Sequence, residues 1–91
     1  MSPEVFECEV RLATTMRDQS SDSPYWSGYR RGLMRARFGR RFSTNTDHVA
    51  WLEFRSSDDP VIASLGRGYT DGVQTIITGS PQRDVVHARP M

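Results

Sequence analysis

The sequence contains no lysine, a single cysteine and no long apolar run. Without lysine the chain has neither the phosphate-binding lysine of a P-loop nor an amine for Schiff-base chemistry. Cys8 has no partner for an internal disulfide, which fits a reducing intracellular compartment. No segment reaches the ~18–20 apolar residues of a membrane-spanning helix. Residues 1–4 also lack the basic-then-apolar order of a signal peptide. We therefore expect a cytoplasmic protein that does not enter a membrane.

Residues that could carry chemistry are also few, and their spacing matches no known motif. His48 and His87 are the only histidines, and with one cysteine they do not make a metal-ligand pattern. The adjacent carboxylates Asp58 and Asp59 precede a proline, where helix capping explains Asp59. The glycines of residues 66–72 depart in spacing from a dinucleotide-binding fingerprint. The sequence predicts no metal site, no cofactor and no enzymatic activity.

The length and composition predict one small domain. A chain of 91 residues can build one hydrophobic core, and with 36% hydrophobic residues that core is lean. A homodimer would relieve the shortage of burial. Twelve basic and eleven acidic residues nearly balance, which is unlike a protein that coats nucleic acid regardless of sequence. We expect a single domain over residues 1–91 with a loose tail from about residue 82.

Apolar spacing and capping signals predict an all-α fold, a small bundle of three or four short helices. Three helices are expected, over residues 24–38, 46–55 and 60–78. Each follows polar residues that can cap its first turn, namely Ser23, Thr44 and Asp59. Glycine ends the first and the last of them, at Gly39 and Gly79. The expected core consists of apolar residues at helical spacing: Leu33, Trp51, Leu52, Leu65, Tyr69 and Val73.

The first segment, from Pro3 to about Arg17, carries both helical and strand signals. Ser2 before Pro3, followed by an acidic first turn, is typical of a helix start. The apolar residues at positions 6, 8, 10 and 12 alternate with charged ones, which is typical of a strand. We favour the helix because the capping signal is specific and no hairpin partner is evident. The strand remains the alternative.

Glycines recur at a fixed offset in two of the expected helices. Residues 28–33 align with residues 68–73 at an offset of forty, and each stretch holds two glycines one helical turn apart. A glycine inside a helix costs about 1 kcal/mol relative to alanine. Close approach of another backbone is the usual compensation. We therefore predict that Gly28, Gly32, Gly68 and Gly72 face other backbone closely.

The strongest local signal is a cluster of arginines. All twelve basic residues are arginine, and six of them fall within residues 30–41, with no acidic residue nearby on that helix. A GC-rich genome would give such a solvated face without any function. Arginine also recognises phosphates and carboxylates, and apolar side chains among the arginines would anchor a partner. The predicted partner-binding residues are Arg30, Arg31, Arg35, Arg37, Arg40, Arg41, Met34 and Phe38. The arginines of the helix are expected to face solvent while Tyr29 and Leu33 turn inward.

Four stretches carry a resemblance to other proteins: residues 28–33, 48–52, 58–60 and 65–72. Through them the chain resembles short uncharacterised proteins of phages and integrative elements in GC-rich proteobacteria, a resemblance that implies no particular activity. In size and lack of motifs the chain also resembles anti-CRISPR proteins, which are short and mostly non-enzymatic inhibitors. That likeness implies an RNA-guided CRISPR surveillance complex as a partner and points to no residue. Many anti-CRISPR proteins are acidic mimics of nucleic acid, and the arginine-rich helix departs from that pattern.

These observations predict a binding protein. We expect a phage or mobile-element accessory protein that binds and inhibits a host protein or nucleoprotein complex through the arginine-rich helix. The alternative is a small nucleic-acid-binding regulator that places the same helix against the phosphate backbone. The balanced total charge favours the protein partner, whereas the clustered arginines favour nucleic acid.

Overall fold

Local sequence signals set the element order of the protein. The computed structural model describes residues 1–83. Its elements are α1 (Pro3–Gln19), α2 (Ser23–Phe38), the 3₁₀ turn η1 (Gly39–Arg41), α3 (Asn45–Glu53), the 3₁₀ turn η2 (Phe54–Ser56) and α4 (Pro60–Thr78). No strand occurs in this part of the chain. The all-α prediction is confirmed, and the ambiguous first segment is a helix. Most of the expected tail, residues 84–91, lies outside the described residues.

Three of the four helices begin at a side-chain cap. Ser2 Oγ accepts a hydrogen bond from the Val5 N–H at 3.2 Å, and Thr44 Oγ1 accepts one from the Asp47 N–H at 3.1 Å. Asp59 Oδ1 accepts from two N–H groups of α4, at 2.8 and 3.3 Å. Gly39 and Gly79 end α2 and α4 with positive φ angles of 64° and 74°, which glycine adopts without strain. These boundaries agree with the predicted caps and stops.

The cap predicted for α2 is wrong. Ser23 is the first residue of the helix, and the N-cap residue is Asp22, whose side chain makes no capping bond. The Asp22 carboxylate instead accepts a hydrogen bond from Ser64 Oγ of α4 at 3.1 Å. The Asp22 carboxylate therefore forms a contact between α2 and α4 instead of the capping hydrogen bond expected from its position before the helix.

Replacing Asp59 by alanine is expected to lower the free energy of unfolding by about 1 kcal/mol, because two N–H groups of α4 lose their acceptor. Asp58→Ala is the matched control, since Asp58 is exposed and is not the cap of α4. Urea denaturation followed by circular dichroism measures both variants. Equal losses in the two would contradict a capping role for Asp59.

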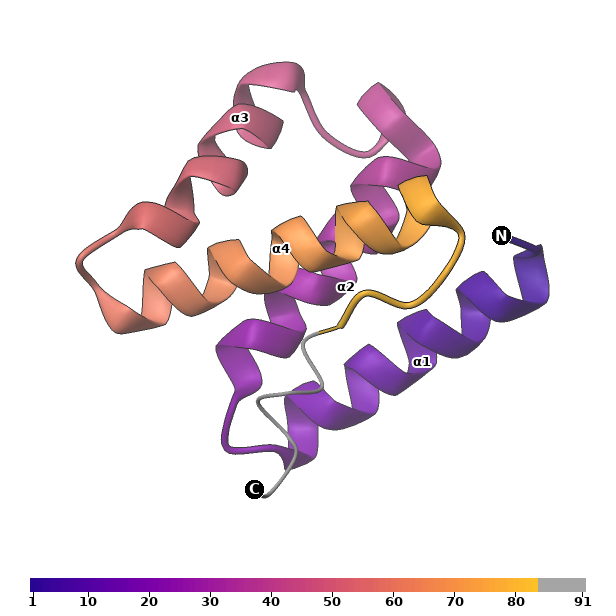
Figure 1. Ribbon diagram of the computed structural model, residues 1–91, viewed down its shortest axis with the longest axis horizontal. Helices are drawn as coiled ribbons and strands as arrows, with labels where there is room; N and C mark the ends of the chain where they lie inside the picture. The colour runs from indigo at the N-terminus through magenta and orange to yellow at the C-terminus, as the bar shows by residue number, and fades with distance from the viewer. Residues whose placement is uncertain (84–91) are drawn as a thin grey trace.

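Helices α2 and α4 cross at the centre of the molecule (Figure 1), with α1 packed against α2 and with α3 and η2 packed against α4. The segment after α4 runs back between α4 and α1. None of the described helices is both long enough and apolar enough to cross a membrane. The crossing of α2 and α4 therefore determines where the outer helices lie.

Glycine makes this crossing close. A Cβ added to Gly28 would overlap the carbonyl oxygen of Leu65, and one added to Gly68 would overlap that of Tyr25. The same relation recurs one turn on, where Gly32 meets Tyr69 and Gly72 meets Tyr29. The prediction that these four glycines face other backbone is confirmed. Each contact maps onto another when α2 and α4 are exchanged by forty residues, so the two helices meet with approximate two-fold symmetry.

The core lies between α1, α2 and α4 rather than around α3. The buried apolar and aromatic side chains are Phe6, Ala13, Tyr25, Trp26, Tyr29, Leu33, Tyr69 and Val73. Three of the expected core residues, Leu33, Tyr69 and Val73, are among them. The others, Trp51, Leu52 and Leu65, are only partly buried. The nine-residue helix α3 buries no residue completely, because it covers the outer side of α4 without a further layer above it.

Candidate functional site

The six arginines predicted as one contact face separate into groups. Two turn toward α1. Arg30 Nε donates a hydrogen bond to Thr14 Oγ1 at 3.1 Å. The Arg37 guanidinium lies 5.1 Å from the centre of the Phe6 ring, and its Nη1 lies 3.5 Å from the carbonyl oxygen of Met1. These contacts join one side of α2 to α1 and to Met1, which precedes it.

Two further arginines turn toward α3. The guanidinium of Arg31 lies over two aromatic rings, 5.2 Å from the centre of Phe42 and 4.8 Å from that of Trp51. Arg35 Nη2 donates a hydrogen bond to Asn45 Oδ1 at 2.7 Å. Stacking on aromatic rings is favourable for the planar guanidinium and fixes its orientation. Arg31 and Arg35 therefore belong to the contact between α2 and the α3 region.

The expectation that all four arginines of α2 project into solvent is wrong for Arg30, Arg31 and Arg35, which are partly buried. Arg37 is exposed, as predicted. The inward orientation of Tyr29 and Leu33 is confirmed, because both side chains are fully buried. A single helical wheel places the arginines on one face, but it cannot show the hydroxyl and aromatic partners that α1 and α3 bring to that face.

An apolar hollow lies between α1 and α2, where Met34 and Phe38 were predicted as anchors. It has a volume of about 350 Å³ and is open to solvent. The apolar residues that line it are Phe6, Val10, Met34 and Phe38, and the charged ones are Glu7 and Arg11. The Phe38 side chain is 43% exposed and contacts the Phe6 ring edge-on, with 5.7 Å between ring centres. A large aromatic side chain at the edge of an open apolar hollow is a typical anchor point for a partner.

A second hollow of about 300 Å³ adjoins the first at Phe38 and is lined by Phe38, Arg41 and Phe42. Gly39 ends α2 immediately after Phe38, and η1 then carries the exposed Arg40 and Arg41 beyond the helix. We call the two hollows together the α1–α2 groove. Sequence reasoning identified Met34, Phe38 and Arg41. It missed the other lining residues, whose place depends on how α1 and η1 pack: Phe6, Glu7, Val10, Arg11 and Phe42.

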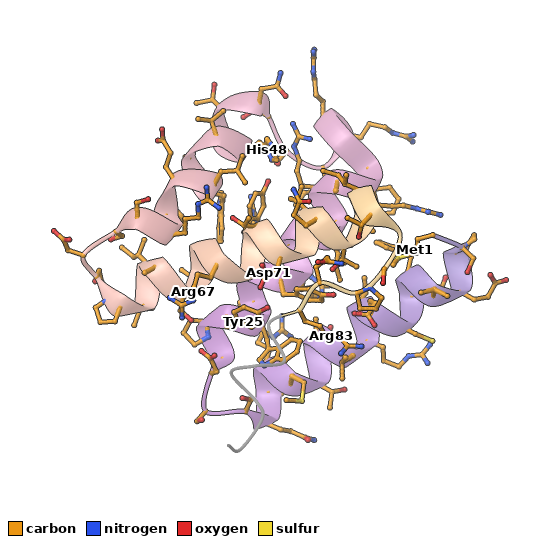
Figure 2. The ribbon with its side chains drawn as sticks, viewed as in Figure 1. Met1, Tyr25, His48, Arg67, Asp71 and Arg83 are labelled. Atoms are coloured by element: carbon orange, nitrogen blue, oxygen red, sulfur yellow. The ribbon has the colours of Figure 1, made fainter. Side chains whose placement is uncertain are left out.

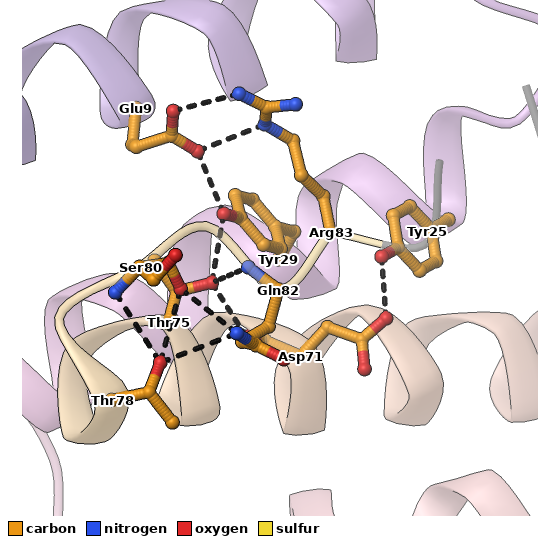
Figure 3. A network of polar contacts seen from close by, with 9 residues as sticks. All are labelled: Glu9, Tyr25, Tyr29, Asp71, Thr75, Thr78, Ser80, Gln82 and Arg83. Atoms are coloured by element: carbon orange, nitrogen blue, oxygen red, sulfur yellow. Dashed lines mark hydrogen bonds and ion pairs between the residues drawn. The ribbon is translucent and has the colours of Figure 1, made fainter. Parts of the chain in front are cut away.

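A buried polar network joins α1, α2, α4 and the segment after α4 (Figure 3). The Tyr29 hydroxyl donates to Glu9 Oε1 at 2.7 Å and lies 3.0 Å from Thr75 Oγ1. Arg83 donates from Nε and Nη2 to the two carboxylate oxygens of Glu9, both at 3.0 Å. The Gln82 N–H donates to Thr75 Oγ1 at 2.7 Å. Residues 82 and 83, where a loose tail was expected to start, are thus bound to the bundle.

The network sets the ionisation of its members. Burial raises the pKa of Glu9, but hydrogen bonds from Arg83 and Tyr29 and the charge of Arg83 outweigh burial, so the pKa lies below the ordinary 4.5. Burial, more than any other cause, raises the pKa of Tyr29 far above 10. Glu9 is therefore a carboxylate and Tyr29 a neutral phenol near neutral pH. Figure 2 shows Tyr25, Asp71 and Arg83 close together, and the Tyr25 hydroxyl donates to Asp71 Oδ2.

A second polar cluster lies on the other side of the crossing, around Tyr69. The Tyr69 hydroxyl and His48 Nδ1 are 2.6 Å apart, and His48 projects from α3 toward the central helices (Figure 2). Burial, assisted by the charge of Arg35, lowers the pKa of His48. Burial raises the pKa of Tyr69, an effect that Arg35 and Arg31 oppose and Asp47 reinforces. Neutral His48 and neutral Tyr69 therefore form this hydrogen bond near neutral pH.

Neither polar cluster of the described residues gathers side chains that could hold a metal ion. Within residues 1–83 no three side chains of histidine, cysteine, aspartate or glutamate come together to hold a metal ion. The single thiol, Cys8, is exposed. Comparison with protein-family models, with curated proteins and with solved structures finds no match to the chain. The function of the protein is therefore inferred from the residues that line the groove and from the arginines beside it.

Proposed function

We propose that the protein is a non-enzymatic binding protein that holds a partner protein in the α1–α2 groove. The observation that carries this proposal is the exposed Phe38 at the junction of two open hollows, beside the exposed arginines Arg37, Arg40 and Arg41. Within residues 1–83 no ion pair joins these arginines to a carboxylate. An apolar centre with a charged rim is the usual construction of a protein–protein interface.

The chemistry of the groove specifies the partner. Its floor takes an aromatic or aliphatic side chain, and its rim favours carboxylates, which arginine binds through two parallel hydrogen bonds. A stable interface covers about 800 Å² on each partner, so the partner must also contact η1 and the outer side of α1. We propose an acidic surface of a host protein or nucleoprotein complex, bound by a phage or mobile-element inhibitor. The likeness of the chain to anti-CRISPR proteins makes a CRISPR surveillance complex the first candidate.

A nucleic-acid partner is the alternative, and the structure weakens the argument for it. Contacts to the phosphate backbone need several arginines free to reach successive phosphates. Arg30 turns toward α1 whereas Arg31 and Arg35 turn toward α3, so the six arginines do not form one continuous face that could follow a phosphate backbone. The net charge of +1 also gives little general attraction to a polyanion.

The test is a charge reversal of the rim combined with truncation of the anchor. A variant with Phe38→Ala, Arg40→Glu and Arg41→Glu is expected to lose binding to the partner, because both the apolar contact and the ion pairs disappear. The two charge reversals should change the melting temperature little, since exposed charges contribute little to stability. Phe38→Ala should lower it modestly, because the side chain is 43% exposed but contacts the Phe6 ring. The matched control is Arg17→Glu with Arg55→Glu, a reversal of two arginines outside the groove lining.

Capture from a host lysate with and without nuclease identifies the partner, and titration of the purified pair over a range of salt measures the affinity. We expect capture that survives nuclease and a shallow dependence on salt. Binding to phosphates would give a log–log slope of about −0.9 for each neutralised phosphate and would favour the nucleic-acid alternative. Wild-type affinity in the groove variant would contradict the proposal.

A further inference from the structure

The two tyrosine clusters occupy equivalent places in the approximate two-fold arrangement but differ in charge. Tyr29 and Tyr69 correspond at the offset of forty residues. The Tyr29 hydroxyl contacts a residue of the adjoining outer helix, Glu9, and one of the opposite central helix, Thr75. The Tyr69 hydroxyl contacts His48 of its own outer helix. The position equivalent to Thr75 is Arg35, whose charge acts on Tyr69.

Charge is compensated inside the first cluster and left uncompensated in the second. Around Tyr29 the carboxylate of Glu9 is paired with Arg83 through two hydrogen bonds. Around Tyr69 two guanidinium groups, Arg31 and Arg35, lie one helical turn apart. No ion pair joins either of them to a carboxylate in residues 1–83. Asp47 is the acidic residue whose charge is felt at Tyr69, but it forms no ion pair within the described chain.

Both guanidinium groups also retain unused hydrogen-bond donors. Phe42 and Trp51 cover Arg31, and these rings accept no conventional hydrogen bond from its in-plane N–H groups. The Nε atoms of Arg31 and Arg35 are buried and have no hydrogen-bond partner among the described residues. A buried N–H without an acceptor costs free energy, so both guanidinium groups carry donors that the described part of the chain leaves unsatisfied.

The clustering of these donors is what distinguishes them. The third buried Nε atom without a partner among the described residues belongs to Arg67 of α4, whose Nη2 donates a hydrogen bond to Ser64 Oγ. Arg31 and Arg35 instead both act on Tyr69, the hydrogen-bond partner of His48, and the side chains of Arg31, Arg35 and His48 are partly exposed. When Tyr69 donates to Nδ1 of His48, the proton of the neutral ring is on Nε2 and adds another donor.

We propose that Arg31, Arg35 and His48 form a binding site for a small tetrahedral oxyanion such as phosphate. Two guanidinium groups and an imidazole offer more N–H donors than the two oxygens of one carboxylate can satisfy, whereas a tetrahedral oxyanion presents acceptors in several directions. Stacking of Arg31 on Trp51 holds one donor in place before the anion arrives. The site lies on the α3 side of α2 and is separate from the α1–α2 groove.

Trp51 supplies a direct readout. Trp26 and Trp51 are the only tryptophans, so a Trp26→Phe background leaves Trp51 as the sole indole, 4.8 Å from the Arg31 guanidinium. In this background, titration with inorganic phosphate at constant ionic strength is expected to give a saturable change in fluorescence. Sodium acetate and sodium chloride, titrated in the same way, should give no saturation at comparable concentrations.

The variants differ in the direction of their expected effects. Arg35→Gln should weaken phosphate binding about tenfold or more, because a charged donor is lost. Asp47→Asn should tighten binding by a few fold, because removal of a neighbouring negative charge favours an anion. Arg40→Gln, which changes an exposed arginine on η1, and Phe38→Ala, which changes the groove, should both bind phosphate like the parent.

Three results would overturn the oxyanion site. They are the absence of saturation with phosphate, equal or tighter binding of acetate, and an Arg35→Gln variant that binds phosphate as the parent does. If Arg35→Gln fails to fold by circular dichroism, Asp47→Asn decides the matter, and unchanged phosphate affinity in that variant would count against the site. Because the groove variants leave this titration untouched, failure of the site and failure of the groove are distinguishable.

Discussion

Gly68→Ala is expected to lower the free energy of unfolding by about 3 kcal/mol, the upper end of the usual cost of overpacking. The added methyl group would overlap the backbone carbonyl of Tyr25 and crowd the Tyr29 nitrogen at 2.8 Å. Backbone atoms cannot rotate away as a side chain can, so α2 and α4 would have to separate. In open space the same substitution would raise stability by about 1 kcal/mol through better helix propensity. The sign of the change therefore tests the close crossing.

Urea denaturation measures this loss from the midpoint at constant slope. Gly79→Ala is the matched control, because a Cβ there meets only the Met1 nitrogen at an ordinary 3.9 Å and the left-handed backbone conformation, with φ of 74° and ψ of 13°, is what opposes it. That strain should cost about 1–2 kcal/mol, less than the overlap. Gly32→Leu and Gly72→Leu place a larger side chain against opposing backbone, so they should also lower the free energy of unfolding. A raised or unchanged midpoint in Gly68→Ala would mean that the helices do not meet at these glycines.

Loss of the Arg83 side chain is expected to lower the free energy of unfolding by about 2 kcal/mol at neutral pH. Arg83→Ala removes two hydrogen bonds from Glu9, whose side chain is only 8% exposed. Breaking a fully buried pair costs about 3–5 kcal/mol. The Arg83 side chain is 26% exposed, so water reduces that cost. In the exposed ion pair of Arg17 with Asp18, by contrast, Arg17→Ala should cost less than about 1 kcal/mol.

The effect of Arg83→Ala should depend on pH. The pKa of Glu9 is lowered in the folded protein, so its contribution is complete above the unfolded value of about 4.5 and disappears as the pH falls through the lower, folded value. Urea denaturation at pH 7 and at pH 3 should therefore show a smaller difference between the parent and Arg83→Ala at the lower pH. A difference independent of pH, or one that grows on acidification, would contradict the ion pair.

Features encoded by neighbouring residues could be predicted from the sequence. Asp59 and Thr44 cap their helices within three residues, and Gly39 and Gly79 end theirs by adopting positive φ. The close approach of the glycine pairs was also predictable, because a costly residue that recurs at helical spacing needs a packing reason. Helix boundaries and the need for close packing at these glycines follow from such local signals, whereas the helices that meet there do not.

Features that depend on the placement of distant helices could not be predicted. The bond between Glu9 and Arg83 joins residues 74 positions apart, and a carboxylate in α1 gives no sign that it will be buried. The division of the α2 arginines between α1 and α3 likewise follows from the tertiary positions of Thr14, Phe42 and Trp51. Of the residues that line the candidate groove, Met34, Phe38 and Arg41 were predicted from the sequence. The residues that α1 contributes could be identified only from the way α1 packs against α2.

The glycine crossing has a kinetic consequence. Each of its contacts joins residues about forty positions apart, so the chain must close a loop of that length before any of them can form. Helical proteins rich in local contacts fold fastest, and this crossing is the non-local part of the present fold. During synthesis α1 and α2 leave the ribosome before α4 does. Until α4 follows, Tyr25, Tyr29 and Leu33 lack much of their covering, and the nascent chain exposes the aromatic face that the finished protein hides.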